Sequence, residues 1–320
     1  MIDHIPAFST YVNSTEMTIT RRRLLALSGA LAAAAGASVI PFSKALGQAS
    51  PAASPAATPI PVSVTPTKDG YTYPEVTWTV TNDAITISEP VTAGTNRVLL
   101  ANEGTVDQHF FTMLLPAGTD FDAFMKEMDD PNAAMPTWAT TTLIAGNPDW
   151  TLSGKVNEAF ISYDPGQYVV IDPFSPRFAH FTVEGTVPAD QVAPKSDIEV
   201  GMIEMDFTGL EKPVPAGRHL WKLSNNGTTF HEVFFLGVPA GATKDEILDV
   251  IKNPPDGALP PEGYSDNAAG GGSGIISKGH VGWYYLDLAP GSYAAVCFAP
   301  MNFEGPPHAF MGMIRPFTVE

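Results

Sequence analysis

The sequence holds a single cysteine, Cys297, among its 320 residues. One cysteine excludes an intramolecular disulfide and a four-cysteine zinc site, so Cys297 acts only as a thiol or a thiolate. Positive charge is also scarce, because 17 lysines and arginines face 34 acidic residues and leave a formal net charge of −17. A surface this acidic repels phosphate backbones, so we expect no nucleic-acid partner and favour a protein partner with a basic docking patch.

Charged residues are few as well, at 16% of the chain, whereas hydrophobic residues make up 44%. This balance is too apolar for a disordered protein and too polar for one that crosses a membrane several times. The length allows one large domain or two ordinary ones. We therefore expect a folded, soluble body with a proper core.

The N-terminal segment has the pattern of an export signal. Arg21, Arg22 and Arg23 precede an uncharged, alanine-rich run over residues 24–43, which resembles a twin-arginine signal. We predict a signal peptide at 1–48 and a periplasmic, extracellular or cell-surface protein, attached to the membrane only if this run is retained as an anchor. Residues 49–72 are rich in Ala, Ser, Pro and Thr and are predicted to form a linker.

From about Glu75 onward, the chain consists of short segments rich in Val, Thr, Phe and Tyr, bounded by Gly, Pro and Asn turns. This spacing is typical of an all-β sandwich or barrel. The clearest predicted strand regions are 77–87, 96–101, 168–171, 198–207 and 293–298.

The chain also repeats itself. The motifs at 102–105, 108–111, 116–118 and 165–168 recur at 226–228, 231–235, 239–241 and 290–293. Each copy continues into a predicted helix, 121–128 or 244–252, and Thr243 with Glu246 forms a capping box before the second. We predict two homologous β-domains, 73–187 and 197–320, joined by a linker at 188–196, and a flexible glycine-rich loop at 268–274.

Alignment of the two copies places Cys297 opposite Asp172 and leaves a longer loop after Cys297 than after Asp172. That longer loop carries an imidazole, His308, and a thioether, Met313, and a second imidazole, His231, lies earlier in the same copy. A thiolate and two imidazoles in a trigonal array, with a weak axial thioether, form the ligand set of a blue copper electron-transfer site.

On these residues the second copy resembles a cupredoxin, a member of the plastocyanin and azurin superfamily. The Asn-Gly turn before His231, the late Cys297 on a strand and the His-x4-Met ending carry the resemblance. It implies two tandem Greek-key β-sandwiches, each with a short helical insert. It also implies one type 1 copper ion held by His231, Cys297, His308 and Met313, with Met311 as the alternative axial ligand.

The first copy lacks the cysteine but keeps His109, Asp172 and His180. Each histidine directly precedes a phenylalanine, which suits core or edge positions. The alternative is a second, harder site formed by these three residues, which would hold zinc or type 2 copper.

We predict that the protein is an exported carrier of single electrons, with His308 exposed in an apolar collar as the electron port. Open alternatives are a copper store or chaperone, a metal-free cupredoxin-like binding module on the cell surface, and a two-domain copper oxidoreductase such as a nitrite reductase. An enzyme is disfavoured because the seven histidines contain no His-x-His pair and none is adjacent to Cys297.

Overall fold

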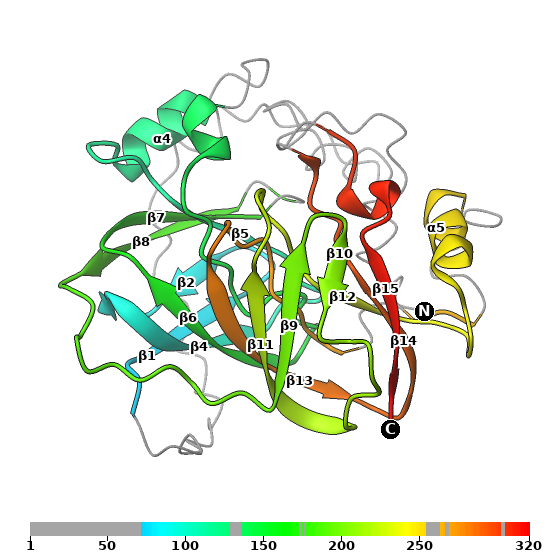
Figure 1. Ribbon diagram of the computed structural model, residues 1–320. Coiled ribbons are helices and arrows are strands. Elements are labelled where there is room, and N and C mark those ends of the chain that lie inside the picture. Colours follow the sequence, from blue (N-terminus) through cyan, green and yellow to red (C-terminus); the bar gives the residue numbers. More distant parts are fainter. Residues whose placement is uncertain are drawn as a thin grey trace.

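The computed structural model describes residues 72–128, 136–172, 175, 177–253, 263–265, 269–301 and 305–320. The predicted signal peptide and all of the predicted linker before residue 72 lie outside these ranges. The described chain is all-β with few helices (Figure 1). Within that part of the chain, no helix has the length and apolar character needed to cross a membrane.

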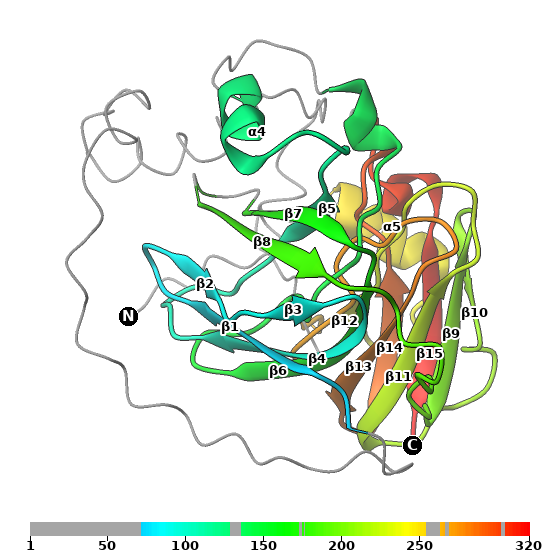
Figure 2. The ribbon, with the colours of Figure 1, turned by 90° about the vertical axis from the view of Figure 1, so that its left-hand side faces the viewer.

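The first half of the described chain forms two layers of strands. One layer contains β1 (Glu75–Val80), β2 (Ile85–Ile87), β4 (Gly94–Asn102) and β6 (Val156–Tyr163). The other has the order β3 (Val91–Thr92), β8 (Phe178–Glu184), β7 (Gly166–Ile171) and β5 (Phe111–Leu114), and Figure 2 shows it above the first. Side chains in β8 alternate between buried and more exposed positions, so its buried face, with Phe181, packs against Trp78 of the opposite layer.

The second half repeats this plan. β9 (Ile198–Ile203), β10 (Asp206–Thr208), β11 (Gly217–Asn225) and β13 (Val281–Leu288) share one sheet, and β12 (Phe234–Gly237), β14 (Gly291–Val296) and β15 (Ile314–Val319) form another. Trp221 on β11 contacts Phe235 and Phe317 from the facing sheet.

Both predicted helices are confirmed, as α4 (Phe121–Met128) and α5 (Lys244–Lys252). The predicted capping box before α5 is also present, because Thr243 and Glu246 satisfy each other's backbone N–H groups. Two short 3-10 helices, η1 (Thr137–Thr140) and η4 (His308–Met311), complete the helical segments that matter here.

The two halves share one continuous sheet. β6 pairs antiparallel with β13, with Phe160 opposite Trp283, so the order β10-β9-β11-β13-β6-β4-β1-β2 runs through both halves. The sequence predicted two separate sandwiches joined by a linker, and it did not predict that a strand of one half pairs with a strand of the other. The Greek-key connectivity and the exact domain limits remain predictions.

The glycine-rich segment lies at this junction. Residues 271–276 are buried, although the sequence predicted a flexible loop. Gly272 pairs with Asp149 of the first half, and a β-carbon on Gly272 would come within 2.8 Å of the Trp150 Cδ1 in the first half and 2.4 Å of the Val233 carbonyl oxygen in its own half. The absence of a side chain at Gly272 therefore lets the two halves approach closely. This contact also fixes the segment 271–276, in which Ile276 pairs with His231.

Candidate metal centre

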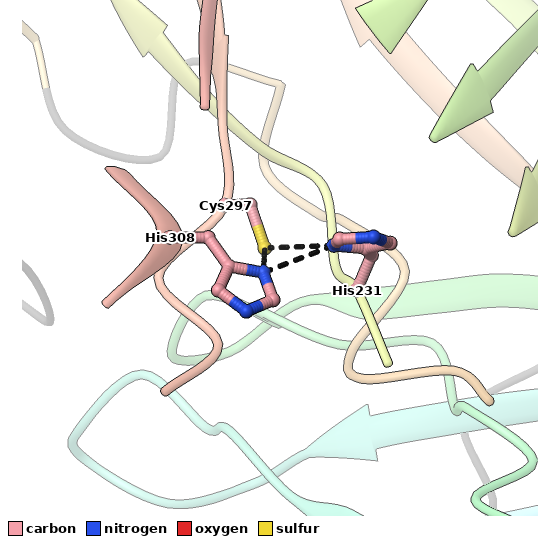
Figure 3. Close-up of side chains that lie close together, drawn as sticks. All are labelled: His231, Cys297 and His308. Carbon is pink, nitrogen blue, oxygen red and sulfur yellow. Dashed lines mark hydrogen bonds between the residues drawn. The ribbon is translucent and has the colours of Figure 1, made fainter. Parts of the chain in front are cut away.

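Two connections at one end of the second half, β11–β12 and β14–β15, bring His231, Cys297 and His308 together (Figure 3). His231 lies between β11 and β12, where its backbone N–H donates to the Ile276 carbonyl and its carbonyl accepts from the Ile276 N–H. Cys297 follows the last residue of β14, and His308 is the first residue of η4. All three side chains are fully buried.

Backbone hydrogen bonds fix the loop between the last two of these residues. The Ala309 N–H donates to the Cys297 carbonyl at 2.7 Å, and the His308 N–H donates to the Ala299 carbonyl at 3.0 Å. The Cys297 N–H donates to the Met313 carbonyl at 3.2 Å. The long loop predicted after Cys297 therefore folds back on the strand end, and His308 returns to the cysteine.

The donor atoms form a compact triangle. The Nδ1 atoms of His231 and His308 lie 3.0 Å apart, and the Cys297 Sγ lies 3.9 Å from the first and 3.5 Å from the second. A point equidistant from three atoms at these separations is about 2.0 Å from each, close to metal bonds with imidazole nitrogen and slightly short for thiolate sulfur. The triangle therefore fits one metal ion with two nitrogen ligands and one sulfur ligand.

Burial sets the protonation state of these side chains. It lowers the pKa of His231 and of His308 to about 4, so both imidazoles are neutral at pH 7. It also raises the pKa of the Cys297 thiol well above its usual range, and the nearby Glu232 adds to this effect. Neutral imidazoles bind a metal directly, whereas the thiol must release its proton when the metal arrives.

The structure separates the two methionines proposed as axial ligand. Met313 is fully buried, and its N–H donates to the His308 carbonyl, so its backbone is tied to two of the three clustered residues. Met311 has 40% of its surface exposed. Burial beside the cluster favours Met313.

His308 does not form the exposed electron port expected from the sequence. Its imidazole is fully buried, and Phe230 lies nearly parallel to it with ring centroids 6.4 Å apart. The expectation was wrong because the loop folds inward on Cys297 instead of presenting the ring edge to solvent. Phe230 is itself buried, with 7% of its surface exposed, and lies beside the His308 ring.

The structure does not assemble the second site predicted in the first half. His109 Nδ1 lies 2.5 Å from an oxygen of Asp149, and its ring stacks on Trp150. Asp172 instead accepts hydrogen bonds from Arg177, and the exposed His180 stacks on Phe121. Each residue has a different partner, and among the described residues only the His231, Cys297 and His308 group meets the geometry for a metal.

Glu232 is a residue that sequence reasoning missed. Its N–H lies 3.5 Å from the Cys297 Sγ, and its carboxylate accepts from the Phe298 N–H at 3.0 Å. Burial raises the pKa of this carboxyl to about 7. Glu232 therefore joins the chain beside His231 to the chain beside Cys297, and its position next to His231 in the sequence was the only available signal.

No protein-family model and no curated protein sequence matches this chain. Similar solved structures include auracyanin A, a "blue" copper protein from Chloroflexus aurantiacus, at 18% identity over 38% of this chain and 97% of that chain, TM-score 0.26. The auracyanin of Roseiflexus castenholzii matches at 22% identity over 38% and 95%, TM-score 0.26. The copper nitrite reductase of Nitrosomonas europaea matches at 14% over 77% and 93%, TM-score 0.23.

Proposed function

We propose that this protein carries single electrons through one copper ion held by His231, Cys297 and His308, with Met313 as the weak axial ligand. The observation that carries the proposal is the triangle of donor atoms, with edges of 3.0, 3.5 and 3.9 Å. Two imidazoles and a thiolate in trigonal array, with a thioether beyond them, are the ligands of blue copper electron-transfer sites.

When bound, copper supplies a reversible one-electron couple. The residues of this chain hold the ligands in place and exclude water from the centre. The backbone hydrogen bonds between the loops hold the ligands in one arrangement, so little reorganisation is needed when the charge changes. The full burial of the three side chains keeps water away from the centre.

A copper enzyme with a second catalytic metal fits less well. Such a centre needs further histidines, and the other four within the described ranges have separate partners. His109 pairs with Asp149, His180 stacks on Phe121, His219 contacts the Ala216 carbonyl, and His280 contacts the Ser162 carbonyl. This dispersion favours a carrier over a catalyst.

A copper store or chaperone uses similar ligands but must release its ion. The three ligands are fully buried in two connections that backbone hydrogen bonds hold in place, which disfavours ready release to another protein. A metal-free binding module leaves unexplained why three donor atoms converge away from solvent.

The net charge of −17 supports a partner protein with a basic docking patch. Electron transfer between the two should then slow as salt is added, because salt screens the attraction. We also propose export by the twin-arginine route and Greek-key connectivity in both halves, as the sequence predicts.

The test is a visible absorption spectrum of the purified protein titrated with Cu(II). We expect an intense red-region band from thiolate-to-copper charge transfer, with saturation at one ion per chain. The Cys297→Ser variant should lose the band, and His231→Ala and His308→Ala should lose or strongly shift it.

The matched control is His180→Gln, which changes an exposed histidine outside the cluster. It should bind copper and absorb as the wild type does. A wild-type protein that binds no copper, or a band that survives Cys297→Ser, contradicts the proposal.

A further inference from the structure

The imidazole of His231 has a second nitrogen whose environment the copper proposal does not explain. With Nδ1 facing the cluster, Nε2 lies on the other side of the ring, is buried and has no hydrogen-bond partner. A metal-bound histidine usually donates its remaining N–H to a carboxylate, a carbonyl or water, and that outer partner fixes the ring and tunes the metal.

An exposed carboxylate, that of Glu204, lies near this edge of the ring, without a hydrogen bond to it in the structure. A β-carbon on Gly227 would lie 2.7 Å from the His231 Nε2 and 2.8 Å from the Glu204 Oε1, so a single methyl group would touch both atoms. Gly227 therefore borders both the imidazole nitrogen and the carboxylate oxygen, and its lack of a side chain leaves room for both. Any larger residue there would push one of them away.

Glu204 is held in this place by its own contacts. It sits in the tight turn between β9 and β10, and the backbone N–H and hydroxyl of Thr228 both donate to its carboxylate. Thr228 follows Gly227 directly, so the contact that anchors the carboxylate belongs to the same turn that leads to His231. The charge of Glu204 also acts on both imidazoles, opposing the larger effect of burial that lowers the pKa of each ring.

We propose that Glu204 is the positioning carboxylate of His231, which orients the ring with Nε2 protonated and Nδ1 free for the metal, and which favours Cu(II) over Cu(I) through its negative charge. This inference rests on the proposed copper function for its second part only. Its first part concerns the copper-free protein as well.

Two variants separate charge from hydrogen-bond acceptance. Glu204→Gln removes the charge but keeps an oxygen for Thr228 and for the imidazole, whereas Glu204→Leu removes both. The control is Asp287→Asn, which removes one exposed charge near the opposite end of the second half, where Asp287 pairs with Arg218 in the β11 and β13 register.

In the loaded protein, Glu204→Gln should lower the Cu(II) affinity about five-fold, affect Cu(I) affinity less, and so raise the reduction potential. The blue band should persist, and Asp287→Asn should change none of these values. Equal potentials in wild type and Glu204→Gln, or an equal shift in Asp287→Asn, overturn the charge effect.

In the copper-free protein, long-range ¹H–¹⁵N NMR spectra report which nitrogen of His231 carries the proton. We expect Nε2 in wild type and Glu204→Gln, and a shift toward the other tautomer in Glu204→Leu. An unchanged tautomer in Glu204→Leu overturns the orienting role. If wild type binds no copper while the tautomer follows Glu204, the copper function fails and the orienting role stands.

Discussion

Gln108 in the first half and His231 in the second half occupy equivalent places in the fold. Gln108 pairs with Thr151 and His231 with Ile276, through isolated bridges of the same antiparallel kind. The side chains of Asn102 and Asn225 donate to the carbonyls of those same two partners. The first half thus places an amide where the second half places an imidazole.

This equivalence corrects the sequence alignment by one residue. The repeat was read by matching Asn102 with Asn226, whereas the hydrogen bonds match Asn102 with Asn225. Because side chains alternate across an extended chain, a slip of one residue moves a side chain to the opposite face. His109 is therefore the counterpart of Glu232, and it turns toward Asp149 at the junction instead of toward Asp172.

In the first half, the guanidinium of Arg177 lies at the place that corresponds to the metal cluster of the second half. Arg177 donates to Asp172, the counterpart of Cys297, and to Gln108 at 2.5 Å. We expect Arg177→Met to cost about 3 kcal/mol of unfolding free energy, because it leaves the buried Asp172 carboxylate without its cation. Urea unfolding measures the loss.

The control for this prediction is Arg218→Met. Arg218 pairs with Glu158 but is half exposed, so its removal should cost about 1 kcal/mol or less. Equal losses in the two variants would show that Arg177 contributes no more than a surface ion pair. The absorption of the copper centre should be unchanged in both.

The two methionines near His308 should behave differently. Met313→Leu keeps the volume of a buried side chain and should cost less than about 1.5 kcal/mol, but it removes the thioether of the residue whose backbone is hydrogen-bonded to Cys297 and His308. We expect a higher reduction potential and a shifted absorption band, since axial ligation tunes such sites. Met311→Leu should leave both values unchanged, and voltammetry with spectroscopy distinguishes the pair. The opposite pattern would make Met311 the axial ligand.

The buried pair of His109 and Asp149 should make stability depend on pH. Burial lowers the pKa of His109, but the charge of Asp149 and its hydrogen bond outweigh this, so the pKa is raised from its usual value. The folded protein therefore binds the proton more tightly than the unfolded chain. The stability from the pair is complete below about pH 6.5 and is lost as pH rises through the folded pKa.

The charges of Glu232 and Asp172 also raise the pKa of His109, by less than Asp149 does. Burial raises the pKa of Glu232 to about 7 in the folded protein. Glu232 therefore also lowers the stability as pH rises from the carboxyl pKa of the unfolded chain toward 7. The Asp149→Asn variant isolates the His109 contribution. Urea unfolding at a series of pH values should show a stability advantage of the wild type over Asp149→Asn that shrinks as pH rises above about 6.5. An advantage that grows over that range contradicts the pair.

The capping box before α5 gives a prediction confined to stability. Ile247 and Ile251 of this helix pack in the same apolar cluster as Ala309 of η4. Thr243→Ala should cost about 1 kcal/mol through the lost cap. Thermal unfolding measures this cost. The copper absorption should not move, because backbone hydrogen bonds that join His308 to Ala299 and Met313 hold it independently of the helix. A loss of the copper band would show that the helix positions His308.

The sequence was informative where local chemistry decides the outcome. Alternating apolar residues predicted the strands, and Thr243 with Glu246 predicted the start of α5. The order of histidine, cysteine and histidine along the chain predicted that His231, Cys297 and His308 come together. It was uninformative where the outcome depends on pairing between distant segments. Nothing in Phe160 or Trp283 indicates that their strands are neighbours, and Arg177 contacts Gln108 only after two loops have folded. The burial of His308 likewise depends on the fold of the whole loop after Cys297.

The pairing of β6 with β13 makes each half the cover of the other's open sheet edge. A fragment that ended between the halves would expose a row of unpaired N–H and C=O groups on a central strand, flanked by Phe160 or Trp283, which is a template for pairing with a second copy. In the intact chain, the half without the predicted metal ligands covers this edge instead. The half that holds those ligands therefore depends on the other half to keep β13 paired along this edge.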